Sequence, residues 1–197
     1  SVMLEMYNAC PDANVSGYEI NRLAANIASI RAYATDSNIY VKPCDVFELP
    51  ADNTYFDKIF SNYPFGMNLR QLGVGQRYLQ QIANKVPTIR KATSSDWVFN
   101  CLIMDLLRKN GKAVAIMTNG STWNTIDTDT RKYFVEQGFI ERVIALPVKL
   151  FSSTNIPTTM IVLSHGNDAV QMVDASDLCV KGRRQNIITD EFIEKIL

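Results

Sequence analysis

The sequence has little of what metal sites, disulfide-rich folds and basic DNA-binding modules need. It contains a single histidine, His165, and four cysteines that are far apart and form no Cys-x-x-Cys pair. This spacing offers neither a zinc site nor a disulfide framework. We therefore expect no metal ion, buried thiols and a reducing, cytoplasmic compartment. The four cysteines are Cys10, Cys44, Cys101 and Cys179.

The chain also lacks an excess of either charge and any long apolar run. It has 20 basic and 20 acidic residues, so its formal net charge is zero. A neutral chain is unlike a freestanding DNA-binding module that works by bulk electrostatics, although a local basic surface is compatible with it. No apolar run reaches the length of a membrane span and no signal peptide opens the chain, so we expect no membrane partner.

Short strands and helices alternate along the chain, which is typical of a parallel α/β sheet. Two later strands follow each other without a helix between them, which indicates an antiparallel pair at one edge of that sheet. The strands are expected at residues 15–20, 39–41, 55–60, 113–117, 139–146, 157–163 and 170–174, and the helices at 2–9, 21–34, 94–109, 128–137 and near the C-terminus.

One segment breaks this alternation. Residues 62–93 contain Gly66, Gly73, Gly75 and Pro87 and no long periodic run, which predicts a long loop. The loop is either a solvated surface or a surface near phosphates. The segment from residue 62 to residue 93 contains no Asp or Glu, and its basic residues are Arg70, Arg77, Lys85, Arg90 and Lys91.

The chain as a whole is expected to have two parts. We expect a catalytic domain over residues 1–166 and a C-terminal extension over 167–197.

Three polar residues fall at the carboxyl ends of predicted strands, where ligands bind in open parallel sheets. Glu19 could accept hydrogen bonds from a ribose diol, and Asp45 could accept one from the amino group of a cofactor adenine. Taken singly, Glu19 suits a solvated cap or an ion pair, and Asp45 suits a residue that closes its own turn. Together with Asn62 they form the candidate cofactor site.

The stretch Asn62-Tyr63-Pro64-Phe65 has the chemistry of a pocket for an amino group. An aromatic amine is a poor nucleophile, and two oxygen acceptors against its hydrogens would raise the electron density on nitrogen. The Asn62 side chain and the Tyr63 carbonyl can supply these acceptors. Pro64 stiffens the turn, and Phe65 offers a face on which an extruded base can stack. The alternative is an Asn-initiated turn with an aromatic residue packed beneath it.

These residues resemble the Asn-Pro-Pro-Tyr/Phe motif of amino-group methyltransferases. More specifically, the chain is similar to the modification subunit of type I restriction-modification systems. The resemblance includes Glu19, Asp45, the segment from residue 145 to residue 159 with its Leu-Pro, Leu-Phe and Ile-Pro-Thr sequences, and a tail containing Arg184-Gln185-Asn186. It covers residues 1–197.

The resemblance implies a Rossmann-like, S-adenosylmethionine-dependent methyltransferase fold that acts on adenine N6 of double-stranded DNA. It also implies a specificity subunit that reads the DNA sequence and a restriction subunit as partners. Residues 1–5 resemble the stretch just after the glycine-rich cofactor turn of this family, so we expect that turn and the helical N-terminal domain to lie outside this chain. Tyr63 replaces the first proline of the motif.

Three other functions share part of this pattern. The first is an amino-methyltransferase that acts on protein glutamine or on RNA, which would share Asn62 to Phe65 but should lack the tail. The second is an assembly subunit that keeps the fold without catalysis. The third is an NAD-binding α/β domain, which Glu19 would suit but which has no use for Asn62 to Phe65.

Overall fold

The chain divides into two compact units, residues 1–53 and residues 54–197, which we call the N-terminal and C-terminal units. The computed structural model describes residues 2–52, 55–67, 73–89, 93–151 and 154–196. Residues 171–174 pair with a strand of the main sheet, so the predicted C-terminal extension lies within the C-terminal unit. The predicted division between residues 166 and 167 stays a prediction.

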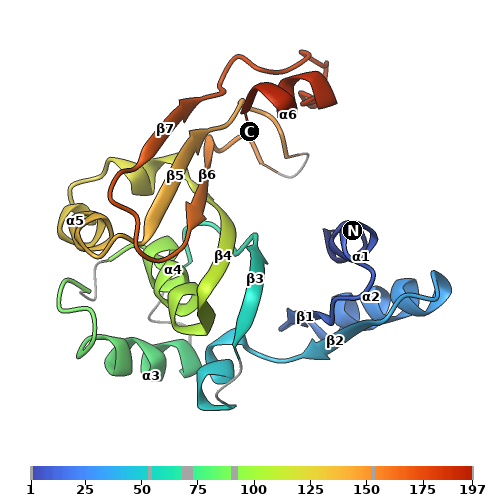
Figure 1. Ribbon diagram of the computed structural model, residues 1–197, viewed down its shortest axis with the longest axis horizontal. Coiled ribbons are helices and arrows are strands. Elements are labelled where there is room, and N and C mark those ends of the chain that lie inside the picture. The colour runs from blue at the N-terminus through green and yellow to red at the C-terminus, as the bar shows by residue number, and fades with distance from the viewer. Residues whose placement is uncertain (1, 53–54, 68–72, 90–92, 152–153, 197) are drawn as a thin grey trace. The chain divides into compact units, whose positions relative to one another are not determined.

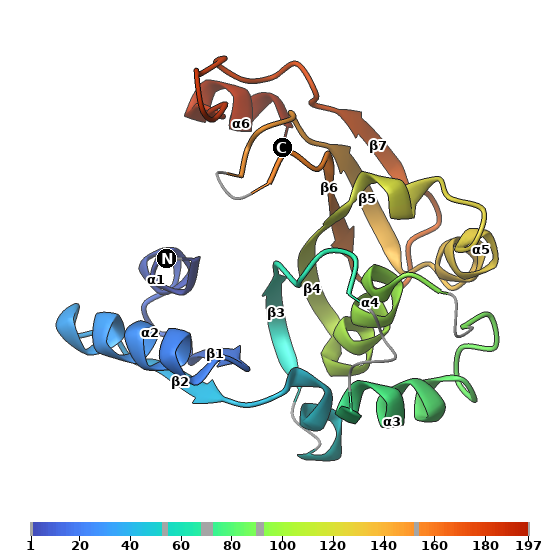
Figure 2. The same cartoon turned by 180° about the vertical axis from the view of Figure 1, so that it is seen from behind.

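The N-terminal unit is a helix followed by a β-α-β unit. Its two strands are parallel, with Glu19 opposite Pro43, and α2 runs along them (Figure 2). Asn21 caps α2, because its side-chain oxygen accepts a 3.1 Å hydrogen bond from the Ala24 N–H. The elements are α1 (Val2–Ala9), β1 (Val15–Glu19), α2 (Arg22–Ala34), β2 (Ile39–Pro43) and η1 (Val46–Asp52).

The helix α2 carries small residues on its buried side and large apolar residues on its exposed side. Ala25 and Ala32 are 1% and 4% exposed, and alanine allows close packing of a helix on its neighbours. Leu23, Ile27 and Ile30 recur at helical spacing, but their side chains are 45–69% exposed. The helical spacing was therefore a correct indication of a helix, but it did not identify the buried face.

The C-terminal unit contains a five-stranded sheet in the order β3-β4-β6-β5-β7 (Figure 1). β6 runs antiparallel to both of its neighbours, and the other four strands are parallel to one another. The predicted antiparallel pair, β5 and β6, is confirmed, but its predicted place at the sheet edge is wrong because β7 pairs with the outer side of β5. The strands are β3 (Phe56–Ser61), β4 (Leu107–Thr118), β5 (Ile140–Ala145), β6 (Thr158–Leu163) and β7 (Gln171–Asp174).

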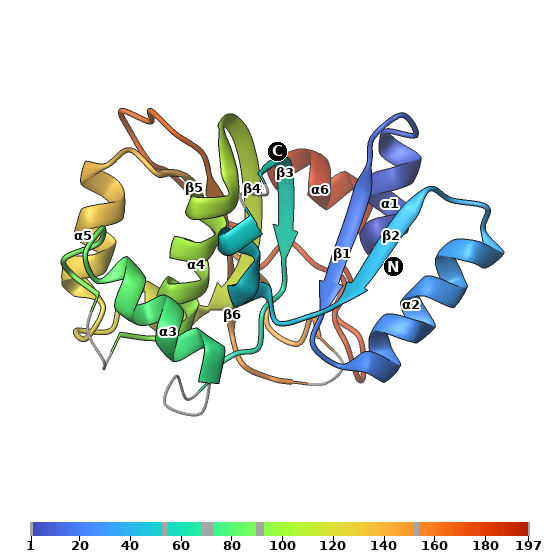
Figure 3. The same ribbon diagram turned by 90° about the horizontal axis from the view of Figure 1, so that it is seen from below.

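Helices α3, α4 and α5 lie on one side of this sheet, and α6 lies on the other (Figure 3). The buried rings of Trp97 in α4 and Phe134 in α5 meet edge to face, 5.0 Å between centroids. Among the residues described, no helix is long and apolar enough to cross a membrane. The helices of this unit are α3 (Gly73–Ile82), α4 (Ser95–Leu106), η3 (Asn119–Thr122), α5 (Thr128–Glu136) and α6 (Asp190–Ile196).

The prediction that residues 62–93 form a loop without regular structure is wrong. Gly73 begins α3, and the two apolar residues one turn apart in it, Tyr78 and Ile82, are 2% and 1% exposed. The two glycines occupy the first turn, where the backbone does not yet depend on a full set of helical hydrogen bonds. The helix is thus stabilised by the burial of one face rather than by helix propensity.

Candidate active site

The structure places Glu19 and Asp45 at the carboxyl ends of neighbouring parallel strands, as expected. Glu19 is the last residue of β1, and its carbonyl accepts a 3.1 Å hydrogen bond from the N–H of Cys44, just after β2. Asp45 is the next residue along the chain. The two carboxylates therefore occupy the same edge of the small sheet in the N-terminal unit.

Each carboxylate uses one oxygen to hold its own local structure. Glu19 Oε1 accepts the Asn21 N–H at 2.8 Å, and Asp45 Oδ1 accepts the Phe47 N–H at 3.0 Å. The turn-closing role that Asp45 could have alone is therefore present. Among the described residues, the second oxygen of each carboxylate has no hydrogen-bond partner, and both side chains are partly exposed. A free carboxylate oxygen of this kind fits a ribose hydroxyl or an amino group as donor.

The stretch from Asn62 to Phe65 follows β3 directly in the C-terminal unit. The Asn62 side chain is exposed and has no hydrogen-bond partner within the described ranges, and Pro64 is exposed as well. Gly66 has a φ of +62°, a left-handed conformation in which glycine is favoured, so the chain turns back at this point. Beyond it, the Met67 N–H donates a 3.1 Å hydrogen bond to Ser95 Oγ at the start of α4.

Tyr63 fixes this turn to the core, although it replaces a proline of the motif. Its side chain is 5% exposed and its hydroxyl donates a 3.1 Å hydrogen bond to Asn100 Oδ1. Its ring stacks on Phe99, with centroids 4.8 Å apart and planes 9° from parallel. A proline would stiffen the turn through its own ring, whereas Tyr63 holds the main chain through contacts with α4. The Tyr63 carbonyl therefore sits on an anchored residue.

The electrostatic surroundings keep the Tyr63 hydroxyl protonated. Burial, followed by the negative charge of Asp96, raises the pKa of Tyr63 well above its ordinary value of 10.0. Asp96 is itself 1% exposed and accepts hydrogen bonds from the N–H and hydroxyl of Thr118 at 2.9 and 2.6 Å and from the Ser121 hydroxyl at 3.0 Å. These donors hold α4 against the carboxyl end of β4 and so fix the helix on which Tyr63 rests.

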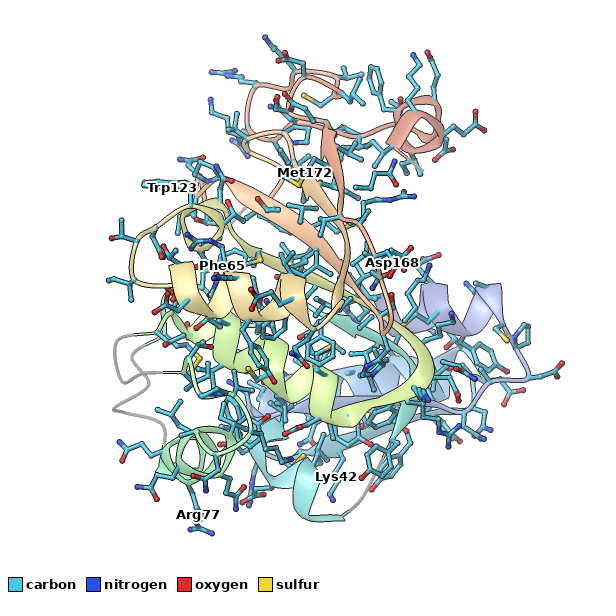
Figure 4. All side chains as sticks on the ribbon, turned by 60° about the vertical axis from the view of Figure 1, so that its left-hand side comes forward. Lys42, Phe65, Arg77, Trp123, Asp168 and Met172 are labelled. Carbon is cyan, nitrogen blue, oxygen red and sulfur yellow. The ribbon has the colours of Figure 1, made fainter. Side chains whose placement is uncertain are left out.

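Phe65 is half-buried and lies edge to face with Phe151, 6.4 Å between centroids at 72°. Figure 4 labels Phe65 on this unit. Both rings belong to a partly buried apolar group that packs on Ile116, Ile144 and Leu146. The Leu-Phe sequence of the family resemblance thus contacts the aromatic residue that was predicted to stack on a base.

The site residues fall into two groups. The structure brings Glu19 and Asp45 together in the N-terminal unit, and it brings Asn62 to Phe65 together in the C-terminal unit. A shared site for all of them stays a prediction. Sequence reasoning missed Asn100, which is 0% exposed, although a lone amide within the apolar run of α4 was a usable signal, because buried polar groups require a partner.

The predicted basic surface is described only in part. Arg77 points away from α3 and is exposed (Figure 4), whereas Lys85 forms a 3.3 Å ion pair with Asp105. Arg70, Arg90 and Lys91 lie outside the described residues. The role of this segment near phosphates stays a prediction.

Comparison with known proteins finds methylase subunits of type I restriction enzymes. A type I restriction enzyme MpnII methylase subunit from Mycoplasma pneumoniae is 31% identical over 114 residues, which are 56% of this chain and 21% of that protein. The crystal structure of a type I restriction-modification system methyltransferase subunit from Streptococcus thermophilus matches with a TM-score of 0.82 and 26% identity, covering 98% of this chain and 43% of that one. The chain therefore spans less than half the length of these relatives.

The fold extends to more distant proteins. A structure described as a class I S-adenosylmethionine-dependent methyltransferase from Listeria monocytogenes matches with a TM-score of 0.64 at 15% identity, covering 88% of this chain and 53% of that one. The predicted Rossmann-like methyltransferase fold is thereby confirmed. The model of the N-6 DNA Methylase family matches residues 1–197. The chain, from its first residue to its last, belongs to the N-6 DNA methylase family.

Proposed function

We propose that this chain is the part of a type I modification subunit that holds the target base, in an enzyme that methylates N6 of adenine in double-stranded DNA. The observation that carries the proposal is the exposed Asn62 side chain next to the anchored main chain of Tyr63, at the carboxyl end of β3. The family and the two type I relatives support the choice of adenine in DNA.

The residues would act by accepting hydrogen bonds from the target amino group. Asn62 Oδ1 and the Tyr63 carbonyl oxygen each accept one N6 hydrogen, which raises the electron density on nitrogen and orients its lone pair. Phe65 stacks on the flipped base. Such acceptors act best when they are held in place before the base arrives. Tyr63 meets this requirement through α4.

S-adenosylmethionine, when bound, supplies the methyl group as part of a sulfonium ion. Glu19 would accept the ribose hydroxyls and Asp45 the adenine amino group, each through the carboxylate oxygen that has no described partner. These assignments keep both carboxylates in their local hydrogen bonds.

The partners follow from the same family. We infer that a specificity subunit reads the DNA sequence and that a restriction subunit joins the assembly. A chain with no net charge has little electrostatic attraction for DNA, so an assembly in which another subunit provides the sequence reading suits its composition. Residues 167–197 are then a contact for such a subunit in addition to completing the sheet with β7.

Methyl transfer by the full-length subunit, assembled with its specificity partner, tests the proposal. We expect transfer of radiolabelled methyl groups to duplex DNA from a host without this modification. Asn62→Ala should abolish transfer while S-adenosylmethionine binding, measured by calorimetry, stays largely intact. The matched control is Asn26→Ala, which removes an exposed amide from α2 and should leave transfer unchanged.

Assays with DNA, RNA and protein glutamine as separate substrates distinguish the proposed function from the alternatives. Transfer to protein glutamine or to RNA, with none to DNA, would contradict the choice of adenine in DNA. A full-length protein that binds its partner subunits but transfers no methyl group to any of the three would be a non-catalytic assembly subunit. The anchoring of Tyr63 by Asn100 favours catalysis, because it retains the acceptor carbonyl where the motif departs from proline.

A further inference from the structure

Residues 180–187 form a closed turn that contacts the loop carrying Phe151. Val180 and Ile187 exchange two backbone hydrogen bonds, 2.8 and 3.0 Å long, and thereby close the turn. Gly182 is required inside it, because a Cβ there would meet the carbonyl oxygen of Gln185. We call residues 180–187 the tail clamp.

The tail clamp binds three consecutive carbonyl groups of the loop. The Asn186 side chain donates to the Val148 carbonyl at 2.8 Å, and the Asn186 N–H donates to the Lys149 carbonyl at 2.9 Å. The Gln185 side chain donates to the Leu150 carbonyl at 2.5 Å. Loops usually leave such carbonyls to water, so this set of contacts defines the path of residues 148–150 in detail.

Asn186 is the central residue of the clamp. It is 7% exposed, and its side-chain oxygen accepts a 3.1 Å hydrogen bond from the Gly182 N–H while its side-chain nitrogen holds Val148. The loop needs this support, because Lys149 has a φ of +57°, a left-handed conformation that costs free energy in a residue with a side chain.

The loop ends on the ring that lies against the predicted base-stacking residue. Phe151 directly follows the three clamped carbonyl groups and meets Phe65 edge to face. Leu150 and Phe151 pack on the same apolar group as Phe65. A displacement of residues 148–150 would therefore change the surface against which Phe65 rests.

We propose that Asn186 is a positioning residue for methyl transfer, which acts through the loop and Phe151 to hold Phe65 in the orientation that receives the flipped base. The inference rests on the proposed function, since it assigns a role to the tail in the same pocket. It also gives a physical reason why a tail with the sequence Gly182-x-x-Gln185-Asn186 follows the proposed base pocket along the chain.

The test uses the full-length subunit with its specificity partner and compares Asn186→Ala and Asn186→Asp with wild type. The aspartate keeps the acceptor for Gly182 but cannot donate to Val148. Methylation of duplex DNA should show kcat lowered about tenfold or more in both variants, because small displacements of a reacting group are costly. KM for DNA and for S-adenosylmethionine should stay within about twofold. Because an unfolded fraction would also lower the apparent kcat without changing KM, kcat is expressed per enzyme molecule that binds S-adenosylmethionine, counted from the calorimetric stoichiometry.

Two further measurements test whether the effect of Asn186 on kcat passes through the loop and Phe151. Amide hydrogen exchange in residues 148–151 should be faster in both variants. In a Phe151→Ala background, Asn186→Ala should lower kcat little further, because residues that act through one another are not additive. Gln137→Ala, which removes an exposed amide just beyond α5, is the matched control and should match wild type in every readout.

The failure of this inference differs from the failure of the proposed function. Wild-type protein that transfers no methyl group to DNA would overturn the proposed function. Wild-type transfer with an unchanged kcat in Asn186→Ala, unchanged exchange in the loop, or fully additive effects of Asn186→Ala and Phe151→Ala would overturn the positioning role alone.

Discussion

The hydroxyl of Tyr63 and the side-chain oxygen of Asn100 are 3.1 Å apart and join the turn after β3 to the middle of α4. The two residues are 37 positions apart in the sequence. Asn100 is fully buried, and its side-chain nitrogen contacts Met117 Sδ at 4.0 Å. The turn that holds the proposed acceptors is therefore coupled to the stability of the core.

Tyr63→Phe should lower the free energy of unfolding by about 1–3 kcal/mol, because it leaves the buried Asn100 oxygen without its donor. Urea unfolding followed by tryptophan fluorescence measures this, since Trp97 and Trp123 both belong to the C-terminal unit. Tyr55→Phe, at an exposed position of the same unit, is the control and should change little. Equal midpoints for wild type and Tyr63→Phe would show that the hydrogen bond contributes nothing.

Phe65→Ala should weaken the handling of the flipped base by about 1–3 kcal/mol, the range for stacking of a base on an aromatic side chain. Phe65→Trp should be milder because it keeps a flat face. The measurement is kcat/KM for methylation of duplex DNA by the full-length subunit. A wild-type kcat/KM in Phe65→Ala would remove Phe65 from the base pocket.

Glu19→Gln should raise the dissociation constant of S-adenosylmethionine by about tenfold or more, because hydrogen bonds to a charged group contribute about 1.5–3 kcal/mol. The substitution keeps an oxygen to accept the Asn21 N–H, so α2 should stay in place. Calorimetry on the full-length protein provides the constants, with Glu48→Gln as the control at an exposed acid of η1. Unchanged affinity would refute the cofactor role of Glu19.

Gly138→Ala should destabilise the C-terminal unit by about 1–2 kcal/mol or more. Gly138 has a φ of +63° and a Cβ there would meet the main chain of Asn167 at 2.8–2.9 Å, so both the conformation and the space oppose a side chain. Gly120→Ala is the matched control, because its φ is not in the left-handed region and nothing lies within 4 Å of its Cβ position. Thermal unfolding should separate the two variants clearly.

Stability should fall at alkaline pH. Burial, followed by the charge of Asp105, raises the pKa of Tyr78 far above its ordinary value of 10.0, and burial also raises that of Tyr63. The two protonated tyrosines contribute fully to the free energy of unfolding at pH values below their unfolded-state pKa of about 10. As the pH rises from there toward the folded-state pKa values, this contribution is lost, because the unfolded chain releases these protons and the folded chain does not. Tyr78→Phe should flatten this decline in unfolding experiments between pH 9 and pH 11, and an equally steep decline in that variant would contradict the assignment.

Local features were predictable from the sequence, and long-range ones were not. The start of α2 after Asn21 and the end of α5 before Gly138 depend on residues a few positions apart, and the helices at residues 21–34 and 128–137 were predicted. The strand ends at Glu19 and Asn62 were also found, because β-strands and the polar residues that follow them are visible in a linear pattern.

The missed features depend on contacts between distant segments. α3 is stabilised by burial of Tyr78 and Ile82, which the glycines at its start concealed. The position of β6 between β4 and β5 in the sheet cannot be deduced from the order of the strands along the chain. For the same reason Asn186 was seen only as part of a tail, although two of its hydrogen bonds tie that tail to the loop before Phe151.

The exposed stripe of α2 has a consequence for the behaviour of this chain as a separate molecule in solution. Leu23, Ile27 and Ile30 present apolar surface to water, and such surface attracts another copy or any other apolar molecule. Charge repulsion does not oppose this attraction, since the chain is neutral at pH 7 and its isoelectric point is near 6.5. We therefore expect association through this surface to limit the concentration at which this chain stays monomeric.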